Sequence, residues 1–384
     1  MPHVRRRGLG LPKDPSLASR GACLFTFLVA TLLGACVGPP TAESEREVRD
    51  LWDQYLASQK GSLVRDASTP SPFWSPAEQA RGADFDLASQ FLPMGAVSRV
   101  LAVTPVSPAL DTAYRIQTRF WADDSSARDS SALPVLTTTV YARREKRRWV
   151  LANALPYHTS AWVRETRGRI HYFVAPALRF NPTKAERAAA FVDSLTAAFD
   201  VEPPRRIDYY VAESVDQAME ILGAVAQQRY GPNGGFARTE RVFSGNPALG
   251  EEYRHELAHV LLAPVFRDSP SSLIASEGVS TWLGGTAGRD FQGSVKHLAT
   301  LLRAQPALDL HRIVYDMTVS SEIRNAAGAV LTQMLHEEGG IEAVKEFLRT
   351  STATVPDLLE RVLQRPWDSI AVDWRRRVDR IAAT

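Results

Sequence analysis

Residues 253–261 read Tyr-Arg-His-Glu-Leu-Ala-His-Val-Leu and contain the pattern His-Glu-x-x-His. On a helix, which turns by about 100° per residue, His255 and His259 lie on one face, and both imidazoles can reach one ion. Glu256 lies roughly 100° round from His255, within reach of a water at that ion but outside its ligand set. Two neutral imidazoles and a carboxylate, with one position left open, suit zinc, Zn2+. The pattern therefore predicts a zinc site with His255 and His259 as ligands and Glu256 beside a metal-bound water.

The amino-terminal segment has the composition of an export signal. Five basic residues and one acidic residue precede Gly21, no charge occurs from Gly21 to Gly38, and residues 24–33 are strongly apolar. A basic stretch followed by a short apolar run is typical of a secretory signal. An uncleaved membrane anchor is the alternative, because 18 uncharged residues can just span a bilayer.

The end of this segment, Leu33-Gly34-Ala35-Cys36, resembles the lipobox of bacterial lipoproteins. The resemblance implies that residues 1–35 form a lipoprotein signal peptide, that Cys36 becomes the lipidated first residue, and that residues 36–42 are a tether. The protein would then be attached to the membrane through the lipid on Cys36, at the outer membrane or the periplasmic face of the bacterial cell envelope. Cys23 is the only other cysteine, so the mature chain would hold no Cys-ligated zinc and no thiolate nucleophile.

The composition of the whole chain limits its size class and its partners. A chain of 384 residues with 45% hydrophobic content can bury one large core or two ordinary ones. Its formal net charge is only +2, which predicts no nucleic-acid partner.

Residues 43–160 form the first expected domain, with one helix followed by β-rich runs. A helix over 45–59 is indicated by apolar residues at helical spacing, and alternating or β-branched runs predict an antiparallel sheet after it. This order of elements, with Arg-Arg-Trp-Val-Leu-Ala-Asn at 147–153 in the last strand, resembles the small domain of the nuclear transport factor 2 type. That fold hosts binding modules and enzymes alike, so it assigns no chemistry. The expected strands are 97–103, 113–121, 135–143 and 148–154.

Residues 168–384 form the second expected domain, in which strands and helices alternate before a helical half. Strands are expected at 170–175, 206–211 and 237–243, with helices at 183–199 and 215–229. The strand at 237–243 is placed to pair with an extended peptide. Pro264 is expected to end the His-Glu-x-x-His helix. The helices expected after it are 271–283, 291–303, 322–336, 341–349 and 367–381.

Three strands, a His-Glu-x-x-His helix and a helical half resemble the gluzincin metallopeptidases, and most closely the peptidase MA-like domains. In this family a Glu on the second helix of the site is the third zinc ligand, and Ser276-Glu277-Gly278 matches the segment that carries it. The resemblance implies zinc bound by His255, His259 and Glu277, and hydrolysis of peptide or protein substrates with Glu256 as the base. Asp268 and His336 are the competing third ligands. Metzincins continue the motif with Gly and His, where this chain has Leu262 and Val265.

The family's oxyanion-stabilising Tyr is absent from the matching place. Relatives often carry it before an Ala-Gly helix segment, but Ala327-Gly328 is preceded by Arg324 and Asn325. The donor stays unassigned among four candidates, Arg324, Asn325, Tyr315 and His336.

The expected fold class is α+β: a small helix-plus-antiparallel-sheet domain, then a zincin-like domain with a mixed sheet and a helical C-terminal half. The expected function is that of a zinc metallopeptidase at the cell envelope. The alternatives are a catalytically inactive zinc-binding interaction or assembly lipoprotein and a metal-stabilised structural domain. Glu256 argues against both, because only catalysis requires a carboxylate beside the ligands.

Overall fold

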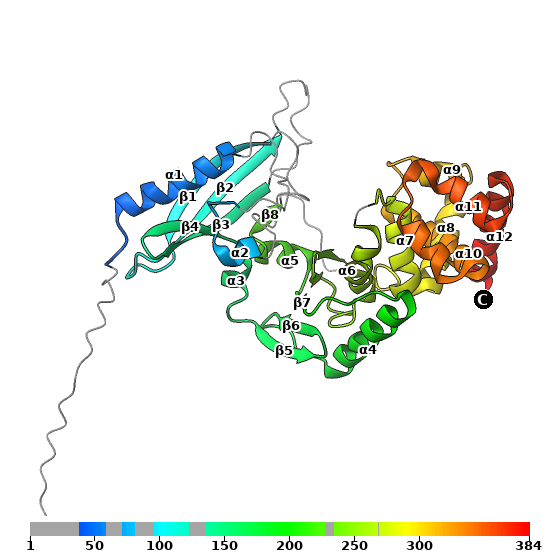
Figure 1. Cartoon of the computed structure of the whole chain (residues 1–384), viewed down its shortest axis with the longest axis horizontal. Helices are drawn as coiled ribbons and strands as arrows, with labels where there is room; N and C mark the ends of the chain where they lie inside the picture. The colour runs from blue at the N-terminus through cyan, green and yellow to red at the C-terminus, as the bar shows by residue number, and fades with distance from the viewer. Residues whose placement is uncertain (1–37, 59–70, 81–95, 123–135, 227–233, 268) are drawn as a thin grey trace, which may run out of the picture.

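The structure, a computed structural model, describes residues 38–58, 71–80, 96–122, 136–226, 234–267 and 269–384. It has the expected α+β class, with one antiparallel sheet, one mixed sheet and a helical C-terminal half (Figure 1). The export segment, Cys36 and Asp268 lie outside the described residues. Among the helices of the described ranges, none is long and apolar enough to cross a bilayer.

The first sheet is an antiparallel meander that begins at β1 (Ala96–Pro105) and runs in the order β1-β2-β3-β4. Helix α1 (Ala42–Ser58) packs on one of its faces through Val48, Trp52 and Tyr55, all essentially buried. The indole N–H of Trp52 donates to Thr118 Oγ1 at 2.8 Å and so fixes the helix to the sheet. The predicted helix and four strands are confirmed, with ends shifted by a few residues. The other strands are β2 (Ala113–Ala122), β3 (Leu136–Glu145) and β4 (Arg148–Ala152), and the short helices α2 (Pro76–Ala80) and α3 (Leu155–His158) complete this part.

The second sheet is mixed and has the order β5-β6-β7-β10-β9. Strands β6, β7 and β10 are parallel, and the outer strands β5 and β9 pair antiparallel with them. The parallel crossover from β6 to β7 runs through α4 (Pro182–Phe199), whose N-cap Asn181 accepts the N–H of Lys184. The strands are β5 (Val163–Arg167), β6 (Ile170–Val174), β7 (Ile207–Val211), β9 (Gly235–Arg238) and β10 (Arg241–Ser244).

The predicted single strand at 237–243 is wrong, because this segment is a hairpin. Strands β9 and β10 are joined through Thr239 and Glu240, and Thr239 has a φ of +52°. Four consecutive polar residues, 238–241, interrupt the apolar run and are typical of a tight turn. The hairpin makes β9 the last strand of the sheet in the described part of the chain.

The predicted helix at 215–229 is also wrong over residues 222–226, and its last three residues lie outside the described ranges. Helix α5 (Val215–Ile221) stops early, and Gly223, with a φ of +84°, turns the chain into β8 (Ala224–Ala226). Strand β8 pairs antiparallel with β3, so a segment of the second unit belongs to the first sheet. One hydrophobic core accordingly contains Trp52 and Tyr114 together with Met219 and Phe243.

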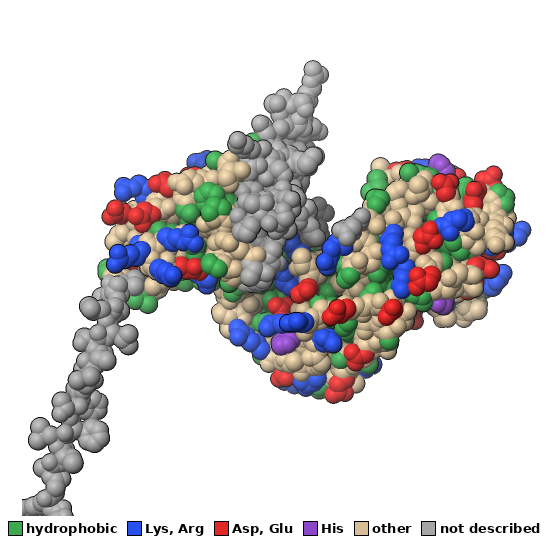
Figure 2. All heavy atoms as spheres, in the orientation of Figure 1, with side chains coloured by type: hydrophobic (Ala, Val, Ile, Leu, Met, Phe, Trp, Pro, Cys, Tyr) green, Lys and Arg blue, Asp and Glu red, His purple; other side chains and the backbone are tan. Residues whose placement is uncertain are grey.

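The helical half begins with α6 (Arg254–Phe266), which carries the His-Glu-x-x-His residues. Pro264 does not end this helix, which continues to Phe266. The helices predicted at 322–336 and 341–349 form α10 (Ser321–Leu348), broken at Gly340, where φ is +64°. Acidic and basic side chains intermix over the visible face of this half (Figure 2). The other helices are α7 (Leu273–Gly284), α8 (Phe291–Ala304), α9 (Leu310–Tyr315), α11 (Val355–Leu363) and α12 (Trp367–Ala383), of which α9 and α11 were not predicted.

Helices α7 and α10 cross with their backbones in contact. A Cβ on Gly278 would lie 2.4 Å from the carbonyl carbon of Gly328, and one on Gly328 would lie 2.2 Å from the carbonyl oxygen of Ile274. Only residues without a side chain permit this approach. The glycine of the Glu277-Gly278 segment is therefore a packing residue, and its contact with Gly328 sets the distance between the two helices.

Replacing Gly328 with alanine is expected to lower the free energy of unfolding by about 1–3 kcal/mol or more, because the methyl group would meet backbone that cannot move aside. Denaturant unfolding monitored by circular dichroism measures this loss. Gly293→Ala in α8 is the control, because a Cβ there meets only side-chain atoms of Asp290 and Arg289, at 3.1 Å and 3.3 Å. Equal stabilities of the two variants would contradict the close crossing.

Candidate metal centre

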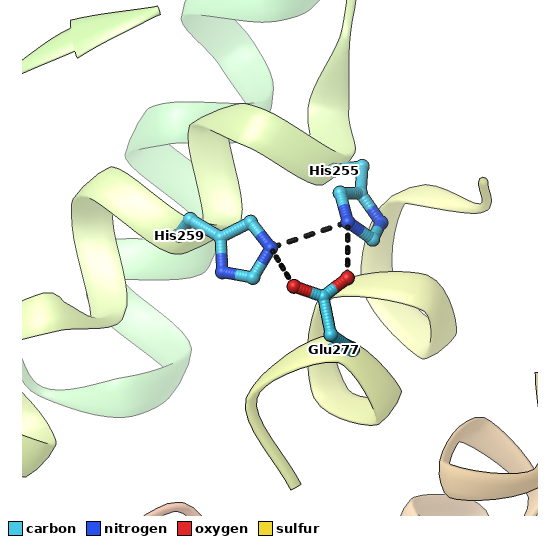
Figure 3. Close-up of side chains that lie close together, drawn as sticks. All are labelled: His255, His259 and Glu277. Carbon is cyan, nitrogen blue, oxygen red and sulfur yellow. Dashed lines mark hydrogen bonds and ion pairs between the residues drawn. The ribbon is translucent and has the colours of Figure 1, made fainter. Parts of the chain in front are cut away.

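Three side chains from two helices converge on one point (Figure 3). His255 and His259 come from successive turns of α6, and Glu277 comes from α7. The two Nε2 atoms are 3.2 Å apart, His255 Nε2 lies 3.3 Å from Glu277 Oε2, and His259 Nε2 lies 3.4 Å from Glu277 Oε1. The helical spacing of the two histidines thus places both rings on the face that Glu277 approaches, as the sequence led us to expect.

Each histidine has a hydrogen-bond partner at Nδ1, and for His255 this partner determines which ring nitrogen carries the proton. His255 Nδ1 lies 2.7 Å from the carbonyl oxygen of Gly285. A carbonyl oxygen only accepts, so Nδ1 carries the proton, and Nε2 of the neutral ring is an acceptor. His259 Nδ1 lies 3.3 Å from Ser280 Oγ. With neutral rings, Nε2 of His255 therefore faces a carboxylate that is itself an acceptor, and a cation or a further proton must lie between them.

The spacing of these atoms fits a zinc ion. Zinc binds imidazole nitrogen and carboxylate oxygen at about 2.0 Å in a tetrahedron, which separates neighbouring ligand atoms by about 3.3 Å. The three observed separations are 3.2, 3.3 and 3.4 Å. Three protein ligands with a fourth position open are also the usual composition of a catalytic zinc site. His255, His259 and Glu277 can therefore hold zinc without rearrangement.

Glu277 is held by a neighbour that supports its ligand role. Asn325, on α10, donates its side-chain N–H to Glu277 Oε2 at 2.9 Å. Burial opposes ionisation of Glu277. When the rings of His255 and His259 are protonated, their hydrogen bonds and charge outweigh burial and hold the pKa of Glu277 well below its usual value. The carboxylate is thus ionised and oriented, as a metal ligand must be.

Glu256 lies beside this group and is not one of the converging side chains. Its side chain is buried, and the backbone N–H of Ala237 in β9 donates a hydrogen bond to its carboxylate. Burial raises the pKa of Glu256 to about 7. The charge of His255 and the hydrogen bond from the Ala237 N–H lower this pKa, and the negative charge of Glu277 raises it. A carboxyl with a pKa near neutrality is suited to take up and release a proton.

The remaining candidate residues have other partners. Arg324 is buried and donates to the carbonyl oxygens of Asp316 and Val319. His336 packs against the ring of Trp282 at 4.9 Å, and Tyr315 is 38% exposed with its ring next to His311. His336 is not in the converging group, and Asn325, proposed from sequence as an oxyanion donor, instead contacts Glu277.

Two supporting residues were missed by sequence reasoning. Gly285 and Ser280 contact the ligands and were not considered, whereas Asn325 was considered in a different role. Ser280 lies three residues after Glu277 on α7, so helical spacing could have indicated it. Gly285 acts through its backbone carbonyl and has a φ of +73°, which no side-chain pattern signals.

A large cavity lies away from the converging group. It measures about 940 Å³ and is lined at one side by the C-terminal turns of α6, including Val260, Pro264 and Arg267. Phe173 and Tyr210 of the second sheet line another side. None of the three converging residues lines this cavity, so it is separate from the candidate metal site.

Asn325→Ala is expected to weaken zinc affinity by about 10–100-fold, because residues that orient a ligand typically contribute this much. Competition with a zinc-binding dye measures the affinity. Glu322→Ala, one turn earlier on α10, is the matched control: Glu322 pairs with Arg289 and His297, away from the ligands. Unchanged affinity in Asn325→Ala would show that Glu277 is oriented without it.

The chain matches no known family model and none of the curated proteins compared with it. The gluzincin resemblance therefore rests on the motif residues of the sequence.

Proposed function

We propose that this protein is a zinc-dependent peptidase of the gluzincin type, anchored to the bacterial cell envelope through a lipid on Cys36. One observation carries the proposal: His255, His259 and Glu277 converge with the separations of a tetrahedral zinc site, and the non-ligand Glu256 lies beside them. A structural zinc site needs a fourth protein ligand and no adjacent base, whereas a catalytic site needs the reverse.

The residues around the site have separate roles in the proposed hydrolysis. Zinc, when bound, supplies a Lewis acid that activates water and polarises the scissile carbonyl. Glu256 takes the proton from the attacking water and passes it to the leaving amine. Its buried position favours the protonated carboxyl that must form between these two transfers. Gly285, Ser280 and Asn325 keep the three ligands oriented.

Strand β9 supports a peptide as the substrate. It is one of the two outer strands of the second sheet as described, and an extended peptide can add to such an edge by backbone hydrogen bonds. Ala237 of this strand contacts Glu256 through its N–H. A peptide paired with β9 would therefore run past the base, with its carbonyl groups next to the metal ligands.

Digestion of a broad peptide library with zinc-loaded protein, with and without a chelator, tests the proposal. Cleavage that the chelator abolishes and zinc restores is the expected result. If zinc-loaded protein cleaves nothing across diverse peptides, the interaction or assembly lipoprotein becomes the better description.

Cys36→Ala is expected to release the protein from membranes or to leave its precursor unprocessed, because two or more acyl chains anchor stably where one does not. Membrane fractionation and intact-mass spectrometry measure the two outcomes. Cys23→Ala is the control, since Cys23 precedes the expected cleavage site. An intact 1–35 segment on the wild-type protein would exclude lipidation at Cys36.

A further inference from the structure

One end of the first sheet brings together two chain turns and the start of the described chain. Ala113 lies opposite Arg143, and the N–H of Arg144 donates to the carbonyl oxygen of Thr112 at 2.9 Å. The connection between β1 and β2 therefore lies beside the turn between β3 and β4. The N–H of Asp111 donates to the carbonyl oxygen of Gly38 at 2.9 Å, which fixes the entry of the chain here as well. We call residues 105–112 and 144–148 the tip.

The tip carries a surplus of unneutralised positive charge. Lys146, Arg147 and Arg148 are exposed and make no ion pair with any residue in the described ranges. Lys and Arg side chains are visible at this end of the domain, where α1 begins (Figure 2).

Most acids near the tip are already engaged by other groups. Ser44 and Tyr114 donate to Asp111, at 2.6 Å and 2.9 Å, and Arg144 lies 3.5 Å from it. Arg143 pairs with Glu145, and Trp149 donates to Glu47. Glu43, in the first turn of α1, is an exposed acid that Lys146, Arg147 and Arg148 outnumber.

The tip also exposes apolar side chains. Val106 is 49% exposed and Leu110 is 48% exposed, both in the connection between β1 and β2. Apolar side chains beside basic ones, on a turn at the end of a rigid sheet, suit the boundary between lipid headgroups and acyl chains. Basic residues near such a surface are attracted by anionic headgroups.

We propose that the tip docks on the surface of a bilayer that contains anionic phospholipids, with Val106 and Leu110 at the headgroup boundary and Lys146, Arg147 and Arg148 among the phosphates. The position of Gly38 favours a membrane over other anionic partners. Cys36 precedes Gly38 by two residues, which span at most about 7 Å of chain. A lipid on Cys36 would bring the bilayer to this end of the first sheet. The choice of a membrane as the partner rests on the proposed lipid anchor, whereas the charged and apolar side chains of the tip would act without the lipid and without peptidase activity.

Docking by the tip would orient the whole molecule. The helical half with the metal centre lies at the opposite end of the molecule from the tip (Figure 1). The metal centre would therefore be held away from the lipid surface and would meet substrates in the surrounding compartment.

Sedimentation with vesicles tests the proposal on a chain of residues 38–384. This chain lacks Cys36 and keeps both large hydrophobic cores as described, because every core residue in the described ranges lies at or after Val48. Binding to phosphatidylcholine vesicles that contain phosphatidylglycerol is expected, weakened by salt, with much less binding to phosphatidylcholine alone. Lys146→Glu with Arg147→Glu should reduce the partition coefficient by at least about 25-fold, at about fivefold for each basic residue. Val106→Ser with Leu110→Ser should reduce it roughly tenfold.

Arg99→Glu with Arg119→Glu is the matched control. These residues are exposed cross-strand partners, make no ion pair with a described residue, and lie about 20 Å from the tip along β1. The change in net charge is the same, but screening over this distance should keep its effect within a fewfold. Equal losses in the two charge-reversed proteins, a loss only in the control, or no binding of the unaltered chain to anionic vesicles would each overturn tip docking. Because the chain lacks Cys36, none of these outcomes bears on lipidation or on peptide cleavage.

Discussion

Glu256→Gln is expected to keep zinc bound and to reduce peptide hydrolysis by at least about a hundredfold. Glu256 is not among the converging ligands, so zinc affinity should change little. The amide that replaces its carboxyl cannot take a proton from water and return it to the leaving amine. Cleavage rates and zinc content, measured on the same preparation, separate these two effects.

Glu252→Gln is the matched control for this variant. Glu252 lies just before α6 and pairs with Arg187 and Arg254 instead of contacting the ligands. Thermal unfolding of the metal-free proteins checks that the variant folds. Burial raises the pKa of Glu256 to about 7, so replacing its carboxyl with an amide removes the free-energy cost of burying a charge. Glu256→Gln should melt no lower than the unaltered protein. Full activity in Glu256→Gln would remove the proposed base.

Glu277→Ala is expected to lower zinc affinity by more than a hundredfold. The variant keeps two protein ligands, one fewer than a catalytic zinc site needs. Loss of a residue that only orients a ligand already lowers metal affinity by about 10–100-fold, so loss of a ligand should lower it further. Equilibrium dialysis followed by metal analysis gives both stoichiometry and affinity.

His336→Ala and Asp268→Ala test the competing third ligands. His336 packs against Trp282, so its replacement should leave zinc binding unchanged, and we expect the same of Asp268. Full zinc retention in Glu277→Ala would remove the gluzincin assignment and leave a His-Glu-x-x-His protein of another type.

The residues that converge could be predicted because their arrangement is local. His255 and His259 are one helical turn apart, so helical periodicity alone places both rings on one face. Glu277 was expected from the family resemblance, and it lies on the next helix, which faces them. The α+β class could be predicted for the same reason, since the alternation of apolar residues reports which face of each element is buried.

The supporting contacts could not be predicted in this way. Asn325 reaches Glu277 across 48 residues of sequence, and that approach depends on the crossing at Gly278 and Gly328. The hairpin of β9 and β10 and the short strand β8 were misassigned because a few polar residues or one glycine changed the direction of the chain. Pairing of β8 with β3 depends on the packing of the second unit, which local sequence does not report.

Strand β8 has a consequence for how this protein is divided. It leaves the second unit, pairs with the central strand of the first, and brings α5 into the same core as Trp52 and Tyr114. Cutting the chain at the junction near residue 160 would expose that core on both fragments, so neither half is an independent module. The two units should melt in one cooperative step and be exchanged between genes only as a pair. Any partner that loosens the first sheet would therefore also destabilise the unit that carries the candidate metal centre.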